Sequence, residues 1–186
     1  MLPSKPTGQY TNYDWCKETY LAAKPHVKEF RVAIDVGCRD GDFTKIMLDD
    51  FDFVHAFDYR NRMKGMNNNK RYGYYQVALG DINKDDVEAY KGTIGKIGRK
   101  DSIKVKQKKL DDYNFSNVDL IKIDVEGYEM NVIKGAVATI DKNNPVLIIE
   151  DNGDTGHDAL NFLLSIGYKV QRKFEKPNPL DIVLVR

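Results

Sequence analysis

The sequence has little of the material that marks several large classes of protein. It contains two cysteines, Cys16 and Cys38, which cannot build a disulfide scaffold, and neither belongs to a CxxC pair typical of a metal or redox site. No stretch approaches the roughly 18 consecutive apolar residues of a transmembrane helix. Residues 1–24 lack the apolar segment of a secretory signal. These absences predict a cytoplasmic protein without a membrane span.

An excess of one charge sign is also missing, because 29 basic residues face 28 acidic ones. This balance gives little support to a nucleic-acid-binding protein. The apolar share of 41% excludes a disordered chain, and the length of 186 residues fits one globular domain over residues 1–186. The charge is nevertheless uneven, because Lys91–Lys109 contains eight basic residues and one acid, Asp101.

Short apolar runs rich in β-branched and aromatic residues predict five main strands. They are Arg31–Val36, Phe53–Phe57, Tyr74–Leu79, Val118–Val125 and Pro145–Glu150. Several are almost continuously apolar, which is typical of a sheet covered on both faces. Segments with helical spacing are Asn12–Ala23, Asp42–Asp50, Glu129–Ile140 and Asp158–Ile166. This alternation predicts an α/β fold with a mostly parallel sheet.

Three regions depart from the alternation. Residues 1–30 form an N-terminal helical segment, and residues 85–110 form a basic, hairpin-like insertion. The end of the chain has the pattern of an antiparallel hairpin with its turn at Pro177-Asn178-Pro179. Within the insertion, Asp86–Lys91 and Ser102–Leu110 are the expected strands, and Gly92–Asp101 is the loop between them.

The turn after the first strand, where Gly37 and Gly41 follow Asp35, is the clearest candidate for a ligand site. Gly37 would let the backbone approach a ligand without a Cβ in the way. Open parallel sheets bind ligands at this end of their strands. A pyrophosphate turn has the pattern G-x-G-x-x-G, whereas Arg39 stands between the two glycines here. The carboxylate of Asp35 therefore favours a cationic ligand group, such as the ammonium group of S-adenosylmethionine. The alternative is an ordinary turn in which the aspartate only caps the next helix.

A second acid, Asp58, follows the second strand. Its two carboxylate oxygens could accept both hydroxyls of a ribose. Alone, Asp58 would be more typical of a solvated loop. Two acids at the ends of consecutive strands favour a nucleoside-like ligand.

Two charged residues, Lys122 and Asp124, interrupt the apolar run of the fourth strand. Burying them costs on the order of several kcal/mol unless each charge is paired. They are two residues apart and therefore share one face of the strand. The pattern indicates a functional site, and the alternative is a structural Lys–Asp pair.

Several segments together resemble the FkbM family of S-adenosylmethionine-dependent methyltransferases. They lie in the family's order between residues 30 and 170, and they are Asp35–Thr44, Ala56–Asp58, Val77–Asp81, Leu110–Asp112 and Val118–Ala136. The last segment, with LIKIDVEGYE followed by IKGA, is the most specific. The chain departs from the family where Arg39 replaces the usual Asn and Asp58-Tyr59 replaces the usual Glu-Pro. Since Asp58 is one methylene shorter than Glu, its ribose contact would be looser or water-mediated.

The resemblance implies a Rossmann-like class I methyltransferase with a seven-stranded, mostly parallel sheet and a C-terminal antiparallel hairpin. It also implies S-adenosylmethionine as cofactor and O-methyl transfer to a hydroxyl, in this family often of a sugar or secondary metabolite. From the matching motifs we expect the cofactor-binding residues to be Asp35, Gly37, Cys38, Arg39, Gly41, Asp58, Tyr59, Ala78, Leu79 and Asp124.

An alcohol is a poor nucleophile near neutral pH, so its methylation needs a general base or a metal. The candidate catalytic groups near the ends of the fourth and fifth strands are Lys122, Asp124, Glu126, Glu150, Asp151 and His157. Asp124 is the first choice because it would lie beside the methyl donor. His157 is a candidate base, with a solvated helix start as its alternative. Asp124, Glu150 and Asp151 could instead hold a divalent cation, but their spacing does not require one.

The basic insertion leaves two interpretations open. Lys104, Lys106 and Lys108 alternate with apolar residues, which is typical of a solvated edge strand. The same charges could bind an anionic acceptor such as a nucleotide-sugar, a glycan phosphate or RNA. Asp124–Gly127 lacks the motif expected of adenine amino-methyltransferases. We predict a sugar or glycan acceptor; the alternatives are RNA ribose methylation and a non-catalytic module that binds a cofactor or nucleotide.

Overall fold

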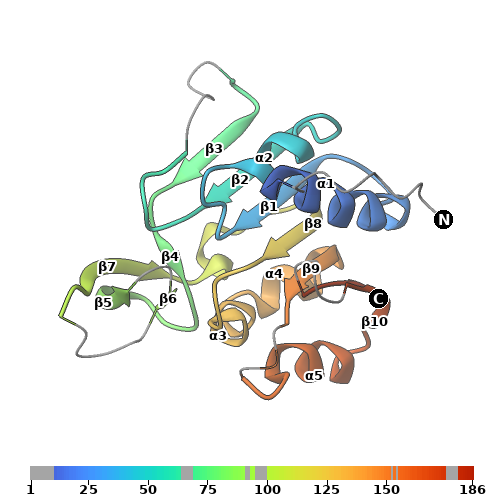
Figure 1. The fold of residues 1–186 in the computed structure, drawn as a ribbon. Helices are drawn as coiled ribbons and strands as arrows, with labels where there is room; N and C mark the ends of the chain where they lie inside the picture. Colours follow the sequence, from blue (N-terminus) through green and yellow to red (C-terminus); the bar gives the residue numbers. More distant parts are fainter. Residues whose placement is uncertain are drawn as a thin grey trace.

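The apolar runs form the parallel strands at the centre of the molecule (Figure 1). The computed structural model describes residues 11–63, 69–90, 93–94, 100–151, 153, 155–174 and 180–186. Within them, the main sheet has the order β10-β11-β9-β8-β1-β2-β3. Its strands are β1 (Val32–Val36), β2 (Phe53–Phe57), β3 (Tyr72–Tyr75), β8 (Val118–Ile123), β9 (Val146–Glu150), β10 (Lys169–Lys173) and β11 (Asp181–Val185).

Strand β11 is antiparallel to both of its neighbours, β9 and β10, whereas the other pairs of this sheet are parallel. The predicted fold class, a seven-stranded and mostly parallel sheet with a C-terminal antiparallel hairpin, is therefore confirmed. The predicted turn at Pro177-Asn178-Pro179 and residues 1–10 of the N-terminal segment lie outside the described residues.

Helices cover both faces of the sheet, as the continuously apolar strands require. They are α1 (Asn12–Ala23), α2 (Asp42–Met47), α3 (Glu129–Lys134), α4 (Val137–Asn143) and α5 (Asp158–Ser165), with short 3-10 turns at Lys24–His26 and Leu110–Tyr113. One core cluster joins α1 and α2 to the sheet, and the other joins α3, α4 and α5 to it. No helix in the described part of the chain is long and apolar enough to span a membrane.

The predicted strand Tyr74–Leu79 is divided between two sheets. Val77 N–H donates to the carbonyl of Tyr75, and this tight turn ends β3. The next residues form β4 (Ala78–Leu79), which joins a second sheet in the order β4-β7-β5-β6. The single strand expected there was therefore wrong, because a local turn redirects the chain into the insertion.

The insertion supplies the other strands of the second sheet, β5 (Lys84–Tyr90), β6 (Thr93–Ile94) and β7 (Ile103–Lys108). Most of its expected loop, residues 92–101, lies outside the described residues. Strand β7 pairs with β5 on one side, and its last two residues pair with β4 on the other. The edge-strand interpretation is thus wrong for Lys108, whereas Lys104 and Lys106 are exposed, and Lys104 lies 3.7 Å from Asp86.

The predicted helix Glu129–Ile140 is broken into α3 and α4. A Cβ on Gly135, at the break, would overlap the carbonyl oxygen of Gly80. The carboxylate of Asp111 accepts hydrogen bonds from the backbone N–H groups of Ala138 (3.1 Å) and Thr139 (2.8 Å). It thereby satisfies free N–H groups in the first turn of α4. The helix restarts there because a distant aspartate caps it.

Candidate active site

A cavity of about 250 Å³ lies at the carboxyl ends of β1, β2, β8 and β9. The predicted site residues that line it are Gly37, Cys38, Arg39, Asp58, Tyr59, Ala78, Leu79, Lys122, Asp124, Glu126 and Glu150. The residues that line it without having been predicted are Asn12, Cys16, Val36, Asp40, Asp42, Phe43, Phe57, Arg60, Val77, Ile94, Val125 and Asp181. Asp35, Gly41, Asp151 and His157 are not among the residues that line it.

Gly37 has a positive φ of 79°, and its N–H donates to the carbonyl of Phe57 at 2.8 Å. A Cβ at this position would overlap the carbonyl oxygen of Asp124. The contact between two strand ends is therefore enough to require a glycine here, and Gly37 also lines the cavity, where a ligand could approach its backbone as expected. Gly41, with a φ of 87°, precedes α2 and lies off the cavity.

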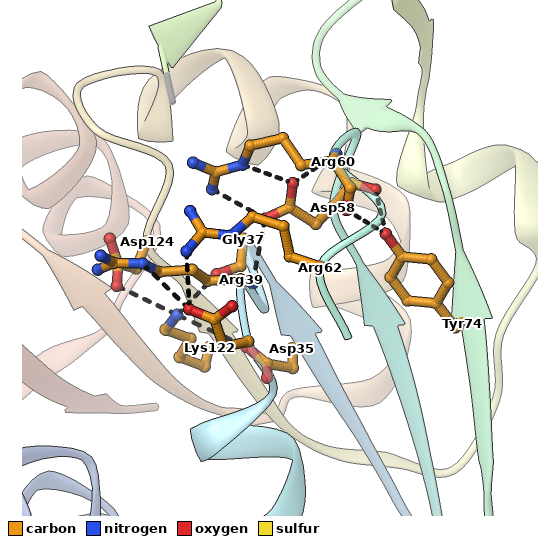
Figure 2. Close-up of polar contacts among 10 residues, drawn as sticks. Asp35, Gly37, Arg39, Asp58, Arg60, Arg62, Tyr74, Lys122 and Asp124 are labelled. Atoms are coloured by element: carbon orange, nitrogen blue, oxygen red, sulfur yellow. Dashed lines mark hydrogen bonds and ion pairs between the residues drawn. The ribbon is translucent and has the colours of Figure 1, made fainter. Parts of the chain in front are cut away.

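Lys122 lies between two carboxylates, as Figure 2 shows. Its Nζ is 3.6 Å from Oδ1 of Asp35 and 3.2 Å from Oδ2 of Asp124. The Lys122 side chain is 3% exposed, and that of Asp35 is 0% exposed. Burial alone would lower the pKa of Lys122, but Asp124 and Asp35 outweigh it and raise that pKa above its usual value.

The two carboxylates of this trio differ in what they face. Thr44 Oγ1 donates to Oδ2 of Asp35 at 2.6 Å, and burial raises the Asp35 pKa against the opposing effects of Lys122 and Thr44. Asp35 does not line the cavity, whereas Lys122 does. Asp124 lines the cavity wall, so it is the carboxylate of the trio that a cationic ligand could reach.

Asp58 closes the cavity at the end of β2, and its carboxylate accepts four hydrogen bonds from described residues. Oδ1 accepts from Arg60 N–H (2.7 Å) and Arg60 Nε (3.0 Å). Oδ2 accepts from Arg39 N–H (3.0 Å) and Arg60 Nη2 (3.0 Å). Tyr74 donates its hydroxyl to the backbone carbonyls of Asp58 and Arg60, which fixes the turn (Figure 2).

Carboxylates gather on the wall formed by β8, β9 and β11. Glu150 lines the cavity, and burial followed by the charges of Asp124 and Glu126 raises its pKa to about 8. Its Oε2 is buried and has no hydrogen-bond partner within the described part of the chain. Asp181 accepts a hydrogen bond from Thr19 Oγ1 at 2.9 Å, and burial raises the Asp181 pKa to about 6. A carboxyl group with a pKa near 8 can exchange a proton close to neutral pH.

His157 and Asp151 lie together away from the cavity. His157 Nδ1 is 2.7 Å from Oδ2 of Asp151, and His157 precedes α5 with a φ of 64°. The structure brings this histidine to Asp151 but not to the other predicted catalytic groups, which line the cavity. Across the described residues, no three His, Cys, Asp or Glu side chains are grouped as metal ligands.

Three lining residues that the sequence analysis missed carry distinct roles. Arg60 is bonded to Asp58, Ile94 comes from the small sheet, and Asp181 begins β11. An acid at the start of the apolar run DIVLV was a usable signal for Asp181. No local pattern indicates Ile94, because its place depends on how the second sheet packs against the first.

The strand order and the antiparallel β11 give this chain the Rossmann-like fold of solved methyltransferase structures. The family model described as the methyltransferase FkbM domain matches residues 59–170. The chain belongs to this family of methyltransferases. A search of curated proteins finds no match.

Solved structures share the fold at low sequence identity. A methyltransferase FkbM from Methylobacillus flagellatus KT is 17% identical with a TM-score of 0.62, and the match covers 87% of this chain but only 45% of that one. A precorrin-6y C5,15-methyltransferase from Geobacter metallireducens is 15% identical (TM-score 0.58, 98% and 92% covered). SMU.1697c from Streptococcus mutans, solved in complex with SAH, is 12% identical (TM-score 0.52, 95% and 97% covered).

Proposed function

We propose that the protein is an S-adenosylmethionine-dependent O-methyltransferase whose acceptor is a hydroxyl of a sugar or glycan. The observation that carries this proposal is the position of Glu150, which lines the same cavity as Asp58 and Asp124 and has a raised pKa. Asp58 and Asp124 suit a nucleoside ligand that carries an amino-acid group, and Glu150 could accept a proton from a hydroxyl in the same cavity.

The residues along the cavity fit the parts of such a cofactor in order. Tyr59, Ala78, Leu79 and Ile94 supply an apolar wall for the adenine. Asp58 would accept the ribose hydroxyls, and Asp124 would pair with the ammonium group. When bound, the cofactor supplies a methyl group on a sulfonium centre, which is reactive toward an aligned nucleophile.

Glu150 is the best base among the predicted acids. Burial and two neighbouring carboxylates hold its pKa at about 8, so its ionised form takes up a proton readily. Its unpartnered Oε2 could accept the hydrogen of an acceptor hydroxyl. This assigns proton removal to Glu150, whereas Asp124, the first choice from sequence, is engaged with Lys122.

The charge of the acceptor wall favours a neutral polyol. Asp124, Glu126, Glu150 and Asp181 all line the cavity, and carboxylates accept hydrogen bonds from sugar hydroxyls but repel phosphate. The exposed lysines of β7 are not among the residues that line it. An uncharged sugar is therefore favoured over a sugar phosphate or RNA close to the transferred methyl.

The proposal is tested with S-adenosylmethionine labelled in its methyl group and a panel of neutral sugars, sugar phosphates and RNA. We expect label in a neutral sugar, and tighter binding of S-adenosylhomocysteine than of NAD by titration calorimetry. Tighter binding of NAD would overturn the assignment of the cofactor. Label confined to RNA, with a steep dependence on salt, would overturn the acceptor and favour ribose methylation.

Chelation tests the base. A carboxylate base needs no cation, so we expect EDTA to leave the methylation rate unchanged. A rate lost in EDTA and restored by Mg²⁺ would show that a cation activates the hydroxyl, and would contradict the role given to Glu150.

A further inference from the structure

We propose that the guanidinium group of Arg60 occupies the ribose-binding positions of Asp58, so that only a ligand with two ribose hydroxyls displaces it. Arg60 would then be a specificity-determining residue for the cofactor. This inference rests on the proposed function, because it takes Asp58 as the group that accepts the ribose hydroxyls.

A carboxylate accepts a limited number of hydrogen bonds. Its two oxygens offer about four lone-pair positions for hydrogen bonds. In this structure four donors from described residues fill them, two on Oδ1 and two on Oδ2 of Asp58. The Asp58 side chain is 2% exposed, which leaves it little access to further donors. The ribose hydroxyls would therefore meet an acceptor whose positions are already taken.

Two of the four donors can leave and two cannot. The N–H groups of Arg39 and Arg60 belong to the backbone, and the Tyr74 hydroxyl fixes the carbonyls on either side of this turn. The Nε and Nη2 donors belong to the Arg60 side chain (Figure 2). This side chain is 26% exposed. Rotation of the Arg60 side chain would free one position on each oxygen without moving the backbone.

Besides its bonds to Asp58, the guanidinium already has weaker favourable interactions. Its Cζ lies 5.2 Å from the centre of the Tyr59 ring, within the range of a cation–π contact. Glu126 lines the same cavity and adds to the attraction that raises the Arg60 pKa, after the larger effect of Asp58. Displacement would therefore break one pair of charge-assisted bonds and leave the guanidinium near groups that still attract it, and two ribose hydroxyls would replace the donors that Asp58 loses.

The selectivity for ligands with two ribose hydroxyls follows from the number of hydrogen bonds that Asp58 keeps. A ligand with both hydroxyls restores the two bonds that Asp58 loses, whereas a ligand with none leaves the carboxylate short of two donors. Arg60 thus weakens the binding of every ligand at this site, but it weakens most the binding of ligands that lack the diol.

The test is a double-mutant cycle measured by calorimetric titration with S-adenosylhomocysteine. Arg60→Met keeps the aliphatic stem and removes both donors, and we expect it to bind about 3- to 30-fold more tightly than the wild type. In the Asp58→Asn background the same change should bring no gain. The matched control is Arg62→Met, because Arg62 donates to Asp40 at 3.0 Å and does not line the cavity, so its affinity should stay that of the wild type.

Arg60→Lys and a spectroscopic readout keep the test decisive if one variant folds poorly. Lysine cannot donate two parallel bonds, so Arg60→Lys should bind between wild type and Arg60→Met. In the wild type, the Nε–H resonance of Arg60 should shift when the ligand is added. Weaker or equal binding by Arg60→Met, with wild-type binding intact, would overturn this inference and leave the proposed function standing. Failure of the wild type and all variants to bind would overturn both.

Discussion

At the scale of single residues, the proposed function makes the chemistry of the site depend on the protonation of Glu150. We expect Glu150→Gln to lower kcat by about 10²- to 10⁴-fold, the usual contribution of a general base. Its affinity for S-adenosylhomocysteine should change little, because the proposed function places Glu150 at the acceptor and not at the cofactor. The kcat of the wild type should rise with pH up to about 8, where Glu150 becomes ionised.

The control for this substitution is Asp141→Asn, which also removes one carboxylate charge. Asp141 is exposed and pairs with Arg186 at 2.9 Å, and it is not among the cavity-lining residues. Its steady-state kinetics should match those of the wild type. A Glu150→Gln enzyme with full activity would exclude Glu150 as the base and return attention to Asp124 and Glu126.

Gly37 sets a limit on substitution at the first turn. Gly37→Ala would place a Cβ on the carbonyl oxygen of Asp124 and force an alanine into a positive φ. We expect a loss of about 2–4 kcal/mol in the free energy of unfolding, measured by urea denaturation.

Gly156→Ala isolates the backbone part of this effect. Gly156 has a φ of 70°, but a Cβ there would only touch Asp158 Oδ1 at 4.0 Å. It should cost about 1 kcal/mol, from conformation alone. Equal losses in the two variants would mean that the strand ends move apart to accept the Cβ.

At the scale of elements, helix α4 depends on a residue outside it. Asp111→Ala removes the carboxylate that accepts from Ala138, Thr139 and the Thr139 hydroxyl. We expect a loss of about 1–2 kcal/mol in the free energy of unfolding, the usual effect of losing an N-terminal cap. The measurement is urea denaturation followed by circular dichroism.

The neighbouring aspartate gives the matched comparison. Asp112 is exposed and accepts from Asn83 Nδ2 at 2.6 Å, whereas the N–H groups at the start of α4 donate to Asp111. Asp112→Ala should cost less than about 0.5 kcal/mol. If Asp112→Ala were as destabilising as Asp111→Ala, the cap would not be the cause.

How far the elements can be predicted depends on whether their signal is local. Most of the main strands follow from apolar runs, because a strand covered on both faces is apolar throughout. Strand β10 is exposed along its length, so the antiparallel hairpin follows instead from its turn residues and from the apolar run of β11. The division of residues 74–79 and the break at Gly135 do not, because each is set by a contact with a distant segment. The same distinction holds for the site. Asp58 and Glu150 could be predicted because each lies at the end of an apolar run, whereas Ile94 and the guanidinium of Arg60 could not, because no local pattern places them at the cavity.

At the scale of the whole molecule, the carboxylates of the cavity affect stability as well as chemistry. Burial raises the pKa of Glu150 from 4.5 to about 8 and that of Asp181 from 3.8 to about 6. Between each pair of values the folded state binds more protons than the unfolded state, so stability falls as pH rises. Their stabilising contribution is complete below about pH 4 and is lost by about pH 8.

Isosteric amides should flatten this dependence. Glu150→Gln and Asp181→Asn remain uncharged at every pH, so each should gain stability relative to the wild type between pH 5 and pH 9. Urea denaturation at the two pH values measures the change. If the difference in stability between the wild type and each variant were the same at pH 5 and at pH 9, the two carboxyl groups would be solvated.

The hydrogen bond from Thr19 to Asp181 joins residues 162 positions apart, and it has a consequence for the order of folding. Helix α1 also brings Asn12 and Cys16 to the cavity, while β11 is held between β9 and β10. Closing so long a loop is slow compared with forming neighbouring contacts. We therefore expect the wall made by α1 to be complete only once β11 has inserted into the sheet, which would make the cavity one of the last parts of the protein to form.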